Sequence, residues 1–312
     1  MSNKRHPLEI GSWIAGIVSA AVALYLLLPN SISSEKKQEP PEIEGGTDIE
    51  LPEVIPMPTN PIPPDIKVKI FSHTSGSAQH PRVKVDVPND YKIIGGGAMV
   101  NWSGHGNLLT SMYPESLNTW VASSKDHTVA SPATITGYAI AIHDPEDEWE
   151  VKVFSSTSSS SAHPRASVNV PDTFVMTGGG ARVHWSGYGN LLTASFPSNK
   201  FSWEVRSKDH GVLSHAPVTA YAIGLRPRNK AALPESHVFA TTGGVTAHPS
   251  SQVAIDNGYI LTGGGALNNW GGYGSLLTSS YPEVTSTWKA SGKNHNVSDP
   301  AAITTYAIGL KK

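Results

Sequence analysis

The sequence has no cysteine, few charged residues and almost no net charge. The absence of cysteine excludes disulfide bonds, thiol catalysis and cysteine-ligated zinc. It leaves the redox compartment open, because both cytosolic proteins and bacterial surface proteins can lack cysteine. A formal net charge of −2 and the lack of a basic stripe give no reason to expect nucleic acid as a partner.

Long apolar runs are also scarce, and the most prominent one lies near the N-terminus. Lys4 and Arg5 precede an uncharged, apolar run at residues 10–28. As a helix this run would be about 28 Å long, close to the roughly 30 Å hydrocarbon core of a bilayer. A cleaved signal peptide has a similar charged start, but its apolar region is normally only about 7 to 15 residues long. We therefore expect an uncleaved signal anchor at 10–28, with residues 1–9 in the cytoplasm.

Proline and glutamate dominate residues 29–66. Such a stretch has too few apolar residues to form a core, and its prolines keep it extended. At about 3.1 Å per residue in a polyproline II conformation it could reach on the order of 100 Å. We interpret it as a stalk in a single-pass membrane protein whose remaining residues lie outside the cytoplasm, at the cell surface or in the periplasm.

The rest of the chain contains one pattern three times. The sequence GGGAMVNWSGHGNLLTSMYP at 95–114 recurs as GGGARVHWSGYGNLLTASFP at 178–197 and as GGGALNNWGGYGSLLTSSYP at 263–282, with offsets of 83 and 85 residues. Repetition at this length indicates one module used three times. The expected modules span residues 67–143, 149–226 and 236–312.

Within each module the apolar residues recur with a period of two. Val83, Val85 and Val87 alternate with polar residues, which indicates a half-buried strand. About six such short strands, bounded by glycine and proline, fit in each module. The sequence therefore predicts an all-β protein of three tandem, small antiparallel β-sandwich or barrel modules. The tryptophans that alternate with polar neighbours inside one of these strands are expected in the core: Trp120, Trp203 and Trp288.

Two histidines recur in every module, 47 residues apart. The first set is His80, His163 and His248; the second ends the steps Lys125-Asp126-His127, Lys208-Asp209-His210 and Lys293-Asn294-His295. If the fold brought both sets together, two imidazoles and a carboxylate could bind a transition metal. Alternatively, these side chains cap turns by bonding to backbone. Because Asn294 replaces the carboxylate and a fourth ligand is missing, we expect no metal and no cofactor, with these histidines as weak candidates only.

A histidine beside an aspartate also suggests general base catalysis. However, no serine or other nucleophile with a recognisable motif accompanies it. Tandem copies multiply weak binding through effective concentration, whereas an enzyme gains little from three adjacent sites. We therefore expect no enzymatic activity, and a metal-dependent hydrolase is the most distant alternative.

The loop after each GGGA strand places two ring side chains among glycines. Rings beside amides and a Lys-Asp-His step suit a polyhydroxylated ligand, because rings stack on sugar faces and polar groups orient hydroxyls. The competing interpretation makes the loop tryptophan a core residue and the glycines a requirement of backbone geometry. We expect the rings of Tyr188, Tyr273 and His105 to lie at the surface. The candidate ligand contacts are His105, Asn107, Lys125, Asp126, His127, Tyr188, Asn190, Lys208, Asp209, His210, Tyr273, Lys293 and His295.

The order GGGA, S-x-[YF]-P, a tryptophan-bearing strand and T-x-YAI resembles modules of bacterial secreted and phage-associated proteins of unassigned function. In the second module these motifs are 178–181, 195–197, Trp203 and 219–223. The resemblance covers nearly all of 67–312 and implies an extracytoplasmic β module, without a catalytic residue. Such modules often have a cysteine before GGG and another after YAI, which this chain lacks.

Together these patterns predict a membrane-anchored recognition or adhesion protein that binds a glycan or another surface polymer through repeated loops. The alternative is a structural surface or envelope protein whose repeats contact other proteins. The oligomeric state, and whether the modules lie in a row or around a pseudo-threefold axis, stay open.

Overall fold

The computed structural model describes residues 61–311, which lie within one compact unit. This part of the chain is all-β: it contains 18 strands in three antiparallel sheets and no helix. The expected anchor at 10–28 and most of the expected stalk lie outside the described residues. Within residues 61–311, no helix is long and apolar enough to cross a membrane.

Each repeat contributes six strands, as the period-two pattern predicted. In the first repeat they are β1 Val68–Thr74, β2 Arg82–Asp86, β3 Tyr91–Asn101, β4 Leu108–Pro114, β5 Thr119–Lys125 and β6 Thr134–His143. In the second they are β7 Trp149–Thr157, β8 Arg165–Asn169, β9 Val175–Val183, β10 Leu191–Asn199, β11 Ser202–Lys208 and β12 Val218–Pro227. In the third they are β13 Ser236–Thr242, β14 Ser250–Ala254, β15 Tyr259–Asn269, β16 Leu276–Val284, β17 Thr287–Lys293 and β18 Ala302–Lys311.

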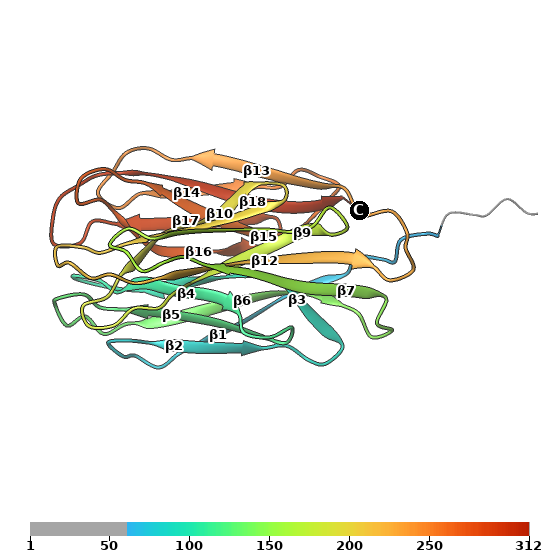
Figure 1. Cartoon of the computed structure of the whole chain (residues 1–312), viewed down its shortest axis with the longest axis horizontal. Helices are drawn as coiled ribbons and strands as arrows, with labels where there is room; N and C mark the ends of the chain where they lie inside the picture. The colour runs from blue at the N-terminus through green and yellow to red at the C-terminus, as the bar shows by residue number, and fades with distance from the viewer. Residues whose placement is uncertain (1–60, 312) are drawn as a thin grey trace, which may run out of the picture. The chain divides into compact units, whose positions relative to one another are not determined.

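No sheet belongs to a single repeat, which differs from the expectation of self-contained tandem modules. Sheet I has the order β1-β6-β3-β16-β17-β14 and joins the first repeat to the third. Sheet II, β2-β5-β4-β9-β12-β7, joins the first to the second, and sheet III, β13-β18-β15-β10-β11-β8, joins the second to the third. Each repeat is therefore a sandwich of three strands on three, and both of its layers continue into a neighbour. Figure 1 shows the strands side by side, with the first repeat in blue to green and the third in orange to red.

The three repeats close into a ring around a pseudo-threefold axis, because every pair of repeats shares a sheet. We call the contacts the first–second, second–third and third–first interfaces. At each junction only two residue pairs are in register, for example Ser111 with Arg182 and Met112 with Ala181. The main apolar core runs through all three repeats, and the predicted core tryptophans Trp120, Trp203 and Trp288 are fully buried in it.

The GGG run explains how the sheets approach so closely. A Cβ on its first glycine, Gly178, would lie 2.8 Å from the backbone oxygen of Ile94 in the neighbouring repeat. A Cβ on the second, Gly179, would lie 2.3 Å from the Trp203 indole, and one on the third, Gly180, would lie 2.4 Å from the Met112 oxygen. Real Cβ atoms do not come so close, so the run permits contact with one neighbouring repeat and with its own core tryptophan. These glycines therefore serve the scaffold.

Candidate functional site

The conserved geometry of the repeats gathers their polar motifs at one end of the unit. The Lys-Asp-His and Lys-Asn-His steps follow β5, β11 and β17, and the glycine-rich loops follow β3, β9 and β15. Because neighbouring strands are antiparallel, both kinds of segment lie at the same end, on the left in Figure 1. The sequence places these motifs in the same repeat, but the structure pairs them between repeats.

The loop of one repeat lies on the Lys-Asp-His step of the preceding repeat. Lys125 Nζ donates a hydrogen bond to the Tyr188 carbonyl (2.6 Å) and lies 5.0 Å from the centre of the Trp185 ring. The His80 ring meets the same Trp185 edge-on at 5.2 Å between centroids. The equivalent contacts recur at the other two interfaces: Lys208 and His163 with Trp270, and Lys293 and His248 with Trp102.

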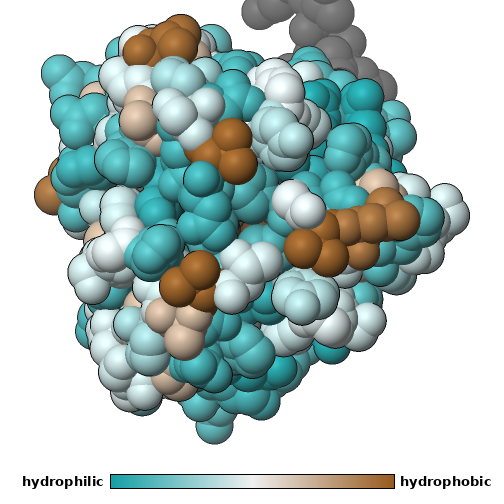
Figure 2. All heavy atoms as spheres, turned by 90° about the vertical axis from the view of Figure 1, so that its left-hand side faces the viewer, coloured by the Kyte–Doolittle hydropathy of each residue, from teal (hydrophilic) through white to brown (hydrophobic). Residues whose placement is uncertain are grey.

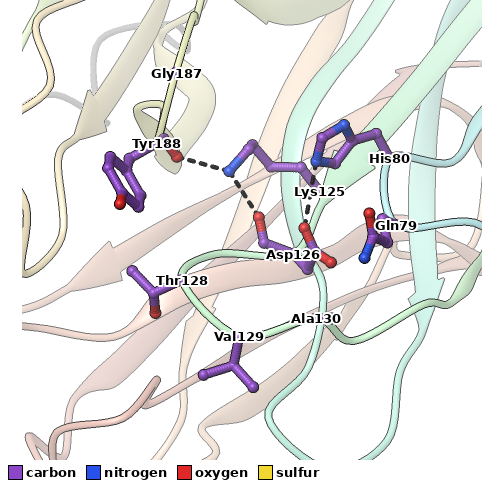
Figure 3. A pocket seen from close by; sticks show the side chains of 9 residues that line it. All are labelled: Gln79, His80, Lys125, Asp126, Thr128, Val129, Ala130, Gly187 and Tyr188. Carbon is purple, nitrogen blue, oxygen red and sulfur yellow. Dashed lines mark hydrogen bonds and ion pairs between the residues drawn. The ribbon is translucent and has the colours of Figure 1, made fainter.

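A hollow of about 430 Å³ opens at the first–second interface, and its residues are drawn in Figure 3. His80 Nε2 lies 3.3 Å from Asp126 Oδ1, and Thr128 and the Tyr188 ring stand at its rim. The Tyr188 ring points away from the lysine that holds its carbonyl. A similar hollow of about 280 Å³ lies at the second–third interface and is lined by His163, Asp209 and Tyr273. Tyr188 and Tyr273 are 57% and 58% exposed, in line with the prediction that these rings lie at the surface.

The loop asparagines are not at the surface. Asn107 and Asn190 are fully buried. Asn190 Nδ2 donates to the Ala162 carbonyl (2.8 Å) and to the Ser214 carbonyl (3.0 Å), and Asn107 makes the same two bonds in its own repeat. These side chains close the loop from inside, so the structure does not support them as direct ligand contacts.

The three lysines are buried as well, beneath the loop tryptophans. Burial lowers the pKa of Lys125 and Lys293, and it lowers the pKa of Lys208 to about 8 although Asp299 and Asp209 act in the opposite direction. Lys125 and Lys293 bond to loop carbonyls, and all three lysines lie over an indole face, which positions the loop of the neighbouring repeat. Lys125 and Lys208 also line the hollows beside Tyr188 and Tyr273.

His127, His210 and His295 converge on the pseudo-threefold axis. Their ring centroids are 5.3 to 5.6 Å apart, and all three are almost completely buried. His127 Nε2 donates to the His210 carbonyl and His210 Nε2 donates to the His295 carbonyl, both at 2.5 Å. Burial is the largest influence on these rings and lowers their pKa values, that of His295 to about 3. They connect the repeats. His210 also lines the hollow beside Tyr273, whereas His127 and His295 are not among the residues that line either hollow.

The third–first interface has the same plan but a different rim. His105 stands where the other loops have tyrosine, and its Nδ1 donates to Asn296 Oδ1 (3.0 Å). Asn296 Nδ2 in turn donates to Thr128 Oγ1 (2.9 Å). Asn294 replaces the carboxylate, and its amide is placed to bond the backbone of Asp299. We call the His105–Asn296–Thr128 chain the latch, because it bridges the rim that Tyr188 and Tyr273 leave open elsewhere.

The fold separates the two histidine sets that the metal hypothesis needed together. His80 and His163 pair with Asp126 and Asp209, whereas His127 and His210 turn towards the axis. Among residues 61–311, no group of three or more histidine, aspartate or glutamate side chains is arranged to hold a metal ion. The structure therefore gives no support to the metal hypothesis.

Sequence reasoning missed the partners that complete each hollow. Thr128 and Val129 line the hollow beside Tyr188, and Gly211 and Leu213 line the hollow beside Tyr273. They follow the Lys-Asp-His step directly, so their position in the repeat was the available signal, but nothing in their residue types marks them. No protein-family model matches the chain, and no curated protein sequence matches it.

Proposed function

We propose that this protein binds a glycan or a similar surface polymer through the hollows at the first–second and second–third interfaces. The observation that carries this proposal is the half-exposed Tyr188 ring at the rim of a hollow that also holds the His80–Asp126 pair. A tyrosine ring stacks on the apolar face of a sugar, while a carboxylate and an imidazole accept and donate hydrogen bonds to its hydroxyls.

The repetition supports binding over catalysis. Two hollows that share a histidine, a lysine, an aspartate and a tyrosine lie at one end of the ring, so a polymer that carries repeated units can engage both. Each hollow alone is shallow, and its few polar groups suit weak, multivalent recognition. We further propose that residues 10–28 anchor the chain and that 29–66 hold the binding end away from the membrane. Protease accessibility on intact cells tests this location.

A protein partner is the second candidate, because apolar side chains are exposed at the same end. Leu213 and Val245 are 75% and 70% exposed. Figure 2 looks onto this end and shows the hydrophobic residues as small separate patches among hydrophilic ones. A protein interface usually buries a larger continuous apolar centre, so this face suits a polar ligand better.

A glycan array probed with the full chain tests the proposal. We expect binding that is lost when Tyr188→Ala and Tyr273→Ala are combined, because both stacking platforms disappear. Phe201→Ala is the matched control: it removes another exposed aromatic ring from the turn between β10 and β11. Binding that survives the double tyrosine variant, or no binding to any glycan by the folded wild type, would overturn the proposal and favour a protein partner.

A further inference from the structure

A second hollow, of about 550 Å³, lies directly beside the Tyr273 hollow at the second–third interface. His163 lines both hollows, and its ring meets Trp270 edge-on at 5.6 Å between centroids. His163, which contacts Trp270, is therefore a wall shared by both hollows, and a chain of linked sugar units can pass over it from one hollow into the other.

The second hollow carries an excess of positive charge. Arg165 and Arg206 line it and are direct neighbours across β8 and β11. Both guanidinium groups bond to the carboxylate of Glu204, which is buried. One carboxylate neutralises one of the two charges. Because each guanidinium has five N–H donors, several donors of both arginines stay free to bind a second anion.

Asn268 and Ser207 also line this hollow. Adjacent residues of a strand point to opposite faces of the sheet, and Leu267 and Arg206 share the row that holds Arg165. The buried side chains of Asn268 and Ser207 therefore face the interior. The groups of this hollow that can meet an anion are the two arginines.

We propose that this second hollow binds the acidic group of a sugar unit, so that the ligand of the second–third interface is an acidic oligosaccharide. Its acidic unit would pair with Arg165 and Arg206, and the adjoining unit would stack on Tyr273. The proposal extends the proposed function, because it adds a charged subsite to one of the two tyrosine hollows.

The other two interfaces lack this pair of adjacent arginines. In the equivalent row of sheet II, Arg82 and Arg182 are separated by Ser123 and Ser111, which sets them roughly 14 Å apart at about 4.8 Å per strand. In sheet I the same row is Ser250, Ser291, Ser279 and Met99, with no charge at all. We therefore assign the acidic subsite to the second–third interface only.

Binding of three polymers to the full chain tests the assignment: polygalacturonate for carboxylates, dextran sulfate for sulfates, and dextran as the neutral control. The variant combines Arg165→Ser, Glu204→Val and Arg206→Ser, which places at each position a residue found in another repeat and leaves no buried carboxylate unpaired. We expect the wild type to bind at least one acidic polymer, more weakly at high salt, and the variant to bind it about tenfold more weakly. Which acidic polymer binds distinguishes carboxylate from sulfate recognition.

The controls separate this proposal from the proposed function. Arg82→Ser, at the equivalent position of the first–second interface, is expected to keep full affinity for the acidic polymer. If the triple variant melts like the wild type and binds the acidic polymer equally well, or if dextran binds as tightly, the acidic subsite is wrong. If acidic binding is lost in the triple variant but unaffected by Tyr188→Ala with Tyr273→Ala, the subsite stands and the tyrosine-based function fails.

Discussion

The three interfaces between repeats use equivalent positions, yet the third–first interface differs from the other two in the groups that face solvent. The first–second and second–third interfaces each have an exposed tyrosine, a His–Asp pair and an open hollow. The third–first interface keeps the tryptophan and the first histidine, Trp102 and His248, but has the latch over its rim. The tryptophan and the first histidine are thus retained at all three interfaces, while the exposed tyrosine and the His–Asp pair are retained at two.

The same interface also lacks two bonds near the axis. Thr177 and Thr262 donate their hydroxyls to the backbone oxygens of Ile94 and Thr177, but Ile94, the equivalent residue of the first repeat, has no hydroxyl. Among residues 61–311, both ring nitrogens of His295 lack a partner, so the histidine chain ends there. This interface closes the ring between repeats that are not consecutive in sequence, and it relies on close backbone packing in place of these bonds.

Substitution of a glycine where this backbone packing is closest is expected to have the largest effect on the free energy of unfolding. A Cβ at Gly95 would lie 2.1 Å from the Thr262 oxygen, whereas one at Gly178 would lie 2.8 Å from the Ile94 oxygen. We expect Gly95→Ala to lower the free energy of unfolding by about 1 to 3 kcal/mol, and more than Gly178→Ala does. Urea denaturation of both variants measures this. Equal losses would show that the third–first interface is not the more tightly packed one.

Acid is expected to destabilise the protein because it protonates the buried histidines on the pseudo-threefold axis. Burial lowers the pKa of His295 from 6.5 to about 3, with His210, His127, Lys293 and His105 adding repulsion. Between these values the unfolded chain binds a proton that the folded chain does not. Stability is therefore complete above pH 6.5 and falls as the pH decreases towards 3.

Melting temperatures measured across this pH range check the prediction. We expect His295→Met to reduce the loss of stability on acidification, because it removes the buried group that titrates. His215→Gln changes an exposed histidine and is expected to leave the pH dependence as it is. An unchanged pH profile in His295→Met would place the acid sensitivity elsewhere in the protein.

The second–third interface has a threonine hydroxyl that the third–first interface lacks. Removing this hydroxyl is expected to lower the stability moderately. Thr262→Val deletes the 2.9 Å bond to the Thr177 oxygen and lowers the free energy of unfolding by about 1 kcal/mol. Thr242→Val, at an exposed edge strand, is the control and is expected to cost less than about 0.5 kcal/mol. Equal costs would mean that the axial bond adds nothing to stability.

Opening the latch is expected to have the smallest effect on stability, but to increase the number of binding sites per chain. The triple variant His105→Tyr, Asn294→Asp and Asn296→Gly installs the residues found at Tyr273, Asp209 and Gly211, with a stability change within about 0.5 kcal/mol. Calorimetric titration with the soluble form of the best array glycan is expected to give two sites per wild-type chain and three per variant chain. Three sites in the wild type would show that the latch does not close its interface.

Much of the scaffold was predictable from the sequence because it depends on local chemistry. Alternating valines gave the strands, and the count of six per repeat is confirmed. The exposed rings at Tyr188 and Tyr273 and the buried Trp203 also follow from their neighbours in sequence. The candidate site was only half predictable. The buried asparagines and lysines are polar residues next to loops, and sequence alone does not distinguish a side chain that closes a loop from one that faces a ligand.

The sequence by itself therefore determined the threefold repetition, the strand pattern and the rings at the loop tips, since these depend on residue order and period. Only the tertiary structure decided that each sheet is shared by two repeats. It thereby paired His80 with Trp185, His163 with Trp270, and His248 with Trp102. The physical reason is that a three-stranded layer leaves an edge with unpaired backbone groups, and pairing that edge with the next repeat satisfies them. The same pairing carries the loop of one repeat over the histidine of another, so each candidate site exists only between repeats.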